Sequence, residues 1–359
     1  MTSLADLPLR DNLRGLTPYG APQLQVKVSL NVNENTHPIP PEVANRIQQA
    51  IAAEISGLNR YPDREFLELR ESLVGYLGQG LSAENIWAGN GSNEVIQHIF
   101  QAFGGPGRKG LSFSPSYSMY SLIASATETA WVNVPRPADY RVDAELVKRA
   151  IAEHNPDLIF FCAPNNPTGT GQDLDAIVAA YEGSSGIIVV DEAYAEFSHD
   201  NANSALSLLA DRPRLVVLRT MSKAFAFAGA RLGYLAGDPA FTDALRLVRL
   251  PYHLSSLTQA AAIAALAEAE TMLATVDDIK FQRDRIVSEL SEMGFSPFPS
   301  ETNFVLFGGI SDSHEAFEGL LSQEILVRDL GIPHHLRVSA GTAEETDAFL
   351  KAIPQFLAR

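Results

Sequence analysis

Three short apolar runs, separated by stretches with helical periodicity, restrict the fold of this chain more than any other feature. They are LIFFCA (158–163), GIIVVDE (186–192) and RLVVLRT (214–220). A strand that is apolar throughout has both faces covered, and such strands are typical of parallel sheets packed between helices. The pattern extends over residues 86–237. We therefore predict an α/β fold with a mostly parallel central sheet covered by helices.

The segments on either side of this region have different patterns. Residues 1–35 contain several prolines and no sustained periodicity, which indicates an N-terminal arm. We expect a large domain over 36–272 and a smaller α+β domain over 273–359. The expected helices of these flanking regions cover 40–55, 65–79, 255–294, 314–323 and 343–358, and the expected strands of the small domain cover 303–307 and 335–341.

Composition excludes several classes of partner. The chain has 359 residues and a net charge of −16, which disfavours nucleic acid and anionic membranes. Cys162 is the only cysteine, so no intrachain disulfide can form, and we interpret it as an inert core residue of a cytoplasmic protein. We find no signal-peptide pattern and no run of about 18 apolar residues that could span a membrane. The eight histidines show no ligand spacing, so we expect no metal site.

Each of the three predicted strands runs directly into polar residues. The first is followed by NNPTG, the second ends in DEAY and the third ends in TMSK. Ligands of open α/β sheets bind beyond the carboxyl ends of the strands. We expect one edge of the sheet to gather Asn166, Asp191, Tyr194, Thr220, Ser222 and Lys223.

The segment AGNGSNEVIQHIFQAF (88–103) is typical of a strand end, a glycine-rich turn and a helix. Ser92 is expected to cap this helix, directly after Gly91. A helix start offers free backbone N–H groups and the positive end of the helix dipole. A phosphate would suit this position, although GNGS taken alone could be a plain helix cap.

A lysine and an arginine lie close together in the apolar segment TMSKAFAFAGARLGY (220–234). Taken alone, Lys223 could be an ordinary surface lysine. Together with the carboxylate, the hydroxyls and the helix start, it matches the needs of pyridoxal 5'-phosphate. That cofactor requires an amine for its aldehyde, a carboxylate for its ring nitrogen, and N–H groups with a guanidinium for its phosphate. We expect Lys223 at the aldehyde end and Arg231 at the phosphate end.

Segments spread over almost the whole chain carry a more specific signal. They are LNVNEN (30–35), NRYPD (59–63), GNGSNE (89–94), PSYSMY (115–120), PNNPTG (164–169), VVDEAYAEF (189–197), TMSKAFAFAGARLGY (220–234), SETNFV (300–305) and HLRVSAG (335–341). In this order they resemble the class II pyridoxal-phosphate-dependent aminotransferases of fold type I, and within them the histidinol-phosphate group.

This resemblance implies a role for each matching residue. Lys223 resembles the lysine that forms the Schiff base and moves the proton, and Asp191 resembles the partner of the ring nitrogen. Tyr194 and Asn166 are similar to the donors to the phenolic oxygen, and Tyr117 is similar to the ring stacked on the cofactor. The resemblance implies a phosphate site made of Gly91, Ser92, Asn93, Thr220, Ser222 and Arg231.

The resemblance also extends to the substrate and to a second subunit. Tyr61 is similar to a tyrosine that reaches the neighbouring subunit's cofactor phosphate, which implies a homodimer with shared active sites. Arg337 and Arg328 resemble the arginines that bind the anionic group of the substrate. Tyr19 and Asn33 would lie on the arm that covers the substrate.

The implied reaction transfers the amino group of L-histidinol phosphate to 2-oxoglutarate, which gives imidazole acetol phosphate and L-glutamate in ping-pong order. Aromatic (phenylalanine) aminotransferases and threonine-phosphate decarboxylases share the lysine, aspartate and arginine set, so the cofactor site does not separate them. GNGSNE and RLPYHLS (249–255) look more like the histidinol-phosphate group. A cofactor-binding gene regulator is a further alternative, but the chain has no spare basic DNA-binding segment.

Overall fold

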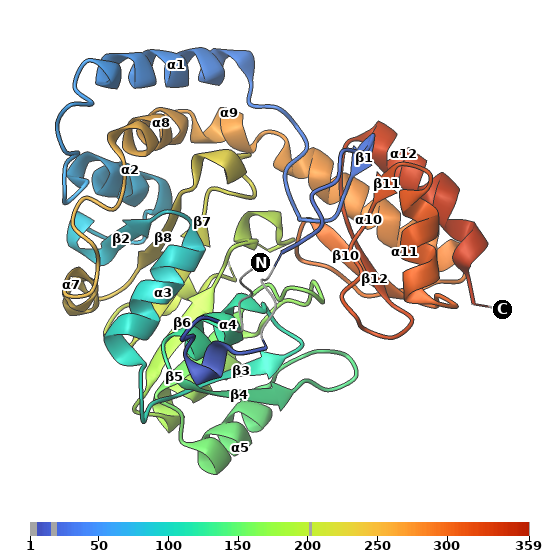
Figure 1. The fold of residues 1–359 in the computed structure, drawn as a ribbon, viewed down its shortest axis with the longest axis horizontal. Helices are drawn as coiled ribbons and strands as arrows, with labels where there is room; N and C mark the ends of the chain where they lie inside the picture. The colour runs from blue at the N-terminus through green and yellow to red at the C-terminus, as the bar shows by residue number, and fades with distance from the viewer. Residues whose placement is uncertain (1–5, 16–19, 201–202, 359) are drawn as a thin grey trace.

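The computed structural model describes residues 6–15, 20–200 and 203–358. In these residues the central sheet has seven strands in the order β2-β8-β7-β6-β5-β3-β4 (Figure 1). Strand β8 is antiparallel to both of its neighbours, and every other pair is parallel. The predicted α/β class with a mostly parallel sheet is confirmed. The strands are β2 (Ile86–Gly89), β3 (Lys109–Ser114), β4 (Ala130–Pro135), β5 (Leu158–Cys162), β6 (Ile187–Asp191), β7 (Leu215–Thr220) and β8 (Gly233–Ala236).

The three apolar runs form the centre of this sheet. All residues of β5 and β7 are buried, and so are all but the first residue of β6. Their continuous apolar character follows from this, because both faces of each strand are removed from water.

The helices of the large domain are α1 (Pro41–Ile55), α2 (Leu67–Leu77), α3 (Ser92–Phe103), α4 (Met119–Ala126), α5 (Ala144–His154), α6 (Leu174–Gly183), α7 (Pro239–Arg246), α8 (Ser256–Leu266) and α9 (Ala269–Leu273).

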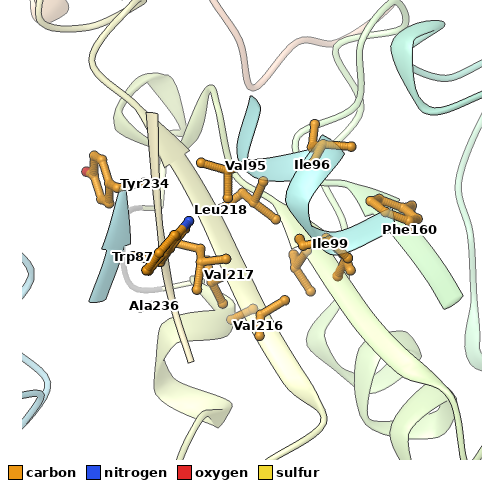
Figure 2. Close-up of a cluster of buried hydrophobic side chains, with 14 of the residues drawn as sticks. Trp87, Val95, Ile96, Ile99, Phe160, Val216, Val217, Leu218, Tyr234 and Ala236 are labelled. Atoms are coloured by element: carbon orange, nitrogen blue, oxygen red, sulfur yellow. The ribbon is translucent and has the colours of Figure 1, made fainter. Parts of the chain in front are cut away.

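Helix α3 packs directly against the middle of the sheet. Its buried residues Val95, Ile96 and Ile99 recur at helical spacing, so they form one apolar face. Figure 2 shows these side chains next to Val216 and Leu218 of β7, with Phe160 of β5 nearby. This contact fixes the start of α3 relative to the ends of the central strands.

The C-terminal part of the chain forms a second hydrophobic cluster around a small antiparallel sheet of order β12-β10-β9. Met272 belongs to the first cluster and Val276 to the second. On this ground we propose that the small domain begins at about residue 273. Its elements are α10 (Val276–Glu292), β9 (Ser296–Pro297), β10 (Phe304–Gly308), α11 (Ser313–Leu321), β11 (Ile325–Leu326), β12 (Leu336–Ser339) and α12 (Ala343–Ala352).

Three details differ from the sequence-based expectations. Within the N-terminal arm, strand β1 (Val28–Ser29) pairs in parallel with β11, so this part of the arm packs on the small domain. The helical region over 255–294 is divided into α8, α9 and α10. The last helix stops as an α-helix at Ala352 and continues as a 3-10 turn over Ile353–Phe356, because Pro354 has no N–H to donate.

None of the described helices combines the length and the apolar character needed to cross a lipid bilayer.

Truncating the packed face of α3 should destabilise the large domain. Ile99 has 0% of its surface exposed, so Ile99→Ala is expected to lower the free energy of unfolding by about 2–5 kcal/mol through lost contacts and a residual cavity. Phe281→Ala is the control, because Phe281 is 65% exposed and its loss should change stability by less than about 0.5 kcal/mol. Denaturant titration measures both values. Equal losses in the two variants would contradict the packing described here.

Candidate active site

A cavity of about 530 Å³ lies at the carboxyl ends of β5, β6 and β7, and residues of the small domain complete its wall. Parallel pairing brings the three strand ends to the same edge, as the sequence predicted. The predicted site residues that line this cavity are Asn33, Ser92, Asn93, Tyr117, Asn166, Asp191, Tyr194, Thr220, Ser222, Lys223, Arg231, Arg328 and Arg337.

Asp191 is the last residue of β6 and is buried. Its Oδ2 accepts a hydrogen bond of 2.7 Å from the Tyr120 hydroxyl, and its Oδ1 accepts one of 3.2 Å from the Ala193 N–H. The pKa of Asp191 is raised to about 6, because the effect of burial exceeds the opposing effect of these two donors. Above that pH the side chain is a carboxylate that can pair with a cationic ring nitrogen.

Lys223 follows β7, and its Nζ donates to the Val32 carbonyl at 3.0 Å. The pKa of Lys223 is lowered to about 8, mainly by burial and also by the positive charges of Arg337 and Arg231, against the opposing effect of Glu34. A neutral amine is a nucleophile and a base, whereas an ammonium is neither. The cavity therefore holds an amine that can react near neutral pH.

The Tyr194 hydroxyl lies at the centre of a hydrogen-bonded chain that joins the two domains. It accepts from Asn33 Nδ2 at 3.0 Å and from Asn166 Nδ2 at 3.3 Å. Asn166 Oδ1 in turn accepts from Arg337 Nη1 at 2.5 Å. Burial raises the pKa of Tyr194, so its hydroxyl keeps its proton and can donate it into the cavity.

The other end of the cavity is formed by the start of α3 and by Arg231. We expected Ser92 to be the N-cap, but Gly91 occupies that position and Ser92 is the first residue of the helix. Gly91 has a φ of +85°, which glycine adopts without strain and which turns the chain into the helix. The Ser92 hydroxyl therefore makes no capping hydrogen bond, and Ser92 lines the cavity.

Two glycines allow the arginine to approach this helix start. A Cβ atom at Gly91 would lie 2.5 Å from Arg231 Nη2, and a Cβ atom at Gly233 would lie 2.0 Å from the Ser92 backbone nitrogen. A guanidinium beside free N–H groups at a helix start provides charge and donors for a phosphate. The donor set thus fits the phosphate end of pyridoxal phosphate.

Hydroxyl and aromatic groups connect the two ends. Thr220 Oγ1 accepts from the Ser222 N–H at 3.1 Å and donates to the Leu232 carbonyl at 3.1 Å. The Tyr117 hydroxyl donates to Asn93 Oδ1 at 3.1 Å, and its ring borders the cavity.

Two predicted residues of the described chain are absent from the cavity lining. One is Gly91, which lies against Arg231. Tyr61 is 79% exposed and stacks on Tyr252 with ring centres 4.4 Å apart. Tyr19 lies outside the described residues. Arg328, by contrast, borders the cavity and its backbone pairs with that of Arg337.

The cavity wall also contains residues that sequence reasoning missed, and Tyr120 and Cys162 are two of them. Tyr120 follows Tyr117 by three residues, so a helix over this segment would have placed the two on one face. Cys162 was expected to be an inert core residue. It is buried, but it also lines the cavity opposite Asp191 in the sheet register, and burial raises the pKa of its thiol to about 12. Among the described residues no group of three His, Cys, Asp or Glu side chains could hold a metal ion.

Comparison with known proteins agrees with this geometry. The family model for aminotransferase class I and II matches residues 25–353. The chain belongs to this aminotransferase family. It is 60% identical to the histidinol-phosphate aminotransferase of Paenarthrobacter aurescens, over 98% of this chain and 95% of that protein. It is 54% identical to the histidinol-phosphate aminotransferase of Thermobifida fusca, over 98% of this chain and 96% of that protein.

A solved structure is also similar over nearly its full length. It is the histidinol-phosphate aminotransferase of Sinorhizobium meliloti in complex with pyridoxal 5'-phosphate, with 27% identity, a TM-score of 0.87 and 97% of both chains covered. This aminotransferase chain and that protein therefore share one fold.

The lowered pKa of Lys223 should be visible in its reactivity. Acetylation of Lys223 by acetic anhydride is expected to accelerate up to about pH 8 and then level off, because the amine is then mostly neutral. Lys148 is the internal control, since its hydrogen bond to Glu145 raises the pKa of that lysine and its rate should keep rising with pH. Mass spectrometry of both residues gives the profiles. A Lys223 rate that still climbed at pH 10 would contradict the shift.

Proposed function

We propose that this aminotransferase transfers the amino group of L-histidinol phosphate to 2-oxoglutarate and forms imidazole acetol phosphate and L-glutamate. The observation that carries the proposal is the cavity itself. One cavity is lined by an amine of lowered pKa, a buried carboxylate, a guanidinium beside a helix start, and two further arginines. The relatives at 60% and 54% identity bear the name of this activity.

Pyridoxal 5'-phosphate is the proposed cofactor, and it would supply an electron-accepting ring for amino-group exchange. Arg231 and the start of α3 would hold its phosphate. Asp191 would pair with its ring nitrogen and Tyr194, with Asn166, would donate to its phenolic oxygen. The other proposed contacts are Tyr117 on the ring face and Asn93, Thr220 and Ser222 near the phosphate.

Lys223 is proposed to bind the aldehyde and to move the substrate proton. Its burial and the nearby charges of Arg337 and Arg231 are the physical basis for this role, because both effects disfavour the ammonium form. Asp191 supports the same step, since a buried carboxylate stabilises a cationic ring more strongly than one in water.

The two small-domain arginines are proposed to select the substrates. Arg337 and Arg328 both border the cavity, and their backbones pair with hydrogen bonds of 2.9 and 3.0 Å. A guanidinium pairs with either a phosphate or a carboxylate through two parallel hydrogen bonds. One site can therefore accept a phosphate monoester and a dicarboxylate in turn, which is the requirement of a ping-pong transamination.

We further propose a cytoplasmic homodimer in which each subunit completes the site of the other. Exposed apolar side chains suit a contact with a second copy. Tyr61 is among them and is absent from the described lining of its own cavity, so we propose that it reaches the partner's cofactor phosphate. The exposed residues in question are Leu58, Tyr61, Leu247, Leu250 and Tyr252.

A comparison of amino donors tests the reaction. The value of kcat/KM for L-histidinol phosphate should exceed that for phenylalanine by at least about tenfold, because only the former offers a phosphate to the arginines. Double-reciprocal plots with 2-oxoglutarate should give parallel lines. Lys223→Ala should lower kcat by about 100-fold or more. A preference for phenylalanine, or carbon dioxide release from threonine phosphate, would support the alternatives instead.

Subunit mixing tests the shared site. Lys223→Ala and Tyr61→Ala homodimers should each have low activity, and their mixture after subunit exchange should regain activity. The hybrid has one site that combines a native Lys223 with a native Tyr61 from the other subunit. Mixing Lys223→Ala with wild type is the control for dilution. No recovery in hybrids that are shown to have formed by mass spectrometry would refute the shared site.

A further inference from the structure

Tyr120 lies directly beneath the carboxylate of the candidate site. Its side chain has 0% of its surface exposed, and its hydroxyl donates to Asp191 Oδ2 at 2.7 Å. The ring packs against Phe160 at 4.9 Å between ring centres and against Tyr117 at 5.4 Å. A phenylalanine would preserve these ring contacts, so the hydroxyl has a separate role from packing.

The described groups around Asp191 offer its carboxylate no positive charge, so the hydrogen bond from the Tyr120 hydroxyl is important for keeping it ionised. The titratable groups that interact with the carboxylate are Tyr120 from α4, Cys162 from β5, and Glu192 and Tyr194 from the segment that continues β6. Burial raises the pKa of all three neutral groups, so they keep their protons, and Glu192 is an acid that raises the pKa of Asp191 further. No group in this set is a cation.

Two donors therefore offset the cost of burying the charge. The Ala193 N–H contacts Oδ1 at 3.2 Å, and the Tyr120 hydroxyl contacts Oδ2 at the shorter distance of 2.7 Å. A hydrogen bond to an ionised group is stronger than one between neutral groups. With one donor on each oxygen, the carboxylate plane is also held in one orientation, and each oxygen keeps a lone pair for a ligand in the cavity.

We propose that Tyr120 is a positioning residue that acts through Asp191: its hydroxyl keeps the carboxylate ionised and oriented for a cationic ring nitrogen. The inference rests on the proposed function, since it assigns the ring nitrogen of the cofactor as the partner of Asp191. It adds a residue of α4 to the groups that determine how tightly the ring is bound and over which pH range.

The test uses 4'-deoxypyridoxine 5'-phosphate, which has the ring nitrogen and the phosphate but no aldehyde, so it forms no bond with Lys223. Its Kd is measured by calorimetry on the full-length, cofactor-free protein between pH 5 and 8.5. Wild type should lose affinity as the pH falls through about 6, because Asp191 then takes up a proton. Tyr120→Phe should move this loss to higher pH and raise Kd at pH 7 by roughly tenfold.

A double-mutant cycle separates action through Asp191 from general damage. In the Asp191→Asn background, Tyr120→Phe should not raise the Kd of the probe any further, because no carboxylate remains for the hydroxyl to hold. Tyr76→Phe is the matched control: its hydroxyl also donates to a carboxylate, Glu196 at 3.1 Å, and Tyr76 is not in the described cavity lining. Its Kd profile should equal that of wild type.

The outcomes are distinguishable. An unchanged pH midpoint in Tyr120→Phe, or additive losses in the double variant, overturns the role of Tyr120 and leaves the proposed function intact. Failure of wild type to bind the probe at any pH overturns the cofactor assignment and the inference with it. If Tyr120→Phe fails to fold, 3-fluorotyrosine at position 120 replaces it. This stronger donor should move the midpoint to lower pH, and no shift again overturns the proposal.

Discussion

Parallel pairing of β5, β6 and β7 is the constraint on which the candidate site depends. In this register Asp191 lies beside Cys162 on one neighbouring strand and beside Leu218 on the other. The chain continues past each strand end into a segment that carries a polar group. Because the ends are hydrogen-bonded to one another, these groups are held close together by the backbone, before any side-chain contact is considered.

A buried ion cluster holds the segment after β6 in place. Arg219 alternates with Thr220 on β7, so the two side chains lie on opposite faces of the sheet. Arg219 Nη2 contacts Glu192 at 2.7 Å, and its Nη1 contacts Glu196 at 3.1 Å. The one guanidinium is shared by two buried carboxylates, and it anchors Glu192 and Glu196, which lie two residues before and two residues after Tyr194. The position of the Tyr194 hydroxyl in the cavity thus depends on a contact behind the sheet.

Segments from both ends of the chain close the cavity. The arm pairs with the small domain through β1, and a few residues later the Val32 carbonyl accepts from Lys223 and Asn33 donates to Tyr194. Arg337 reaches Asn166 across the same gap. Each of these contacts is made to the large domain by a residue that the small domain or the arm positions. The amine, the carboxylate and the arginines therefore share a cavity only when both domains are packed.

The sequence by itself determined the features that depend on local pattern. Continuous apolar runs predicted buried parallel strands, and the polar residues after them predicted the edge where Asn166, Asp191 and Lys223 meet. These strand predictions were confirmed, because strand and helix periods, and the direction of parallel strands, are properties of short segments. The glycine-rich turn before α3 and the Lys223–Arg231 spacing predicted the two ends of the site, and the roles of those ends stay predictions.

Only the tertiary structure decided the rest. The cap of α3 is Gly91 because Arg231 and Gly233, from a distant segment, pack against that turn. The arm strand exists because β11 offers a partner. Tyr120 meets Asp191 across 71 residues of sequence, and the burial of both groups determines their pKa values. Such contacts arise from packing between segments that are far apart in the sequence. The residue pattern within one segment does not specify where the other segment lies in space.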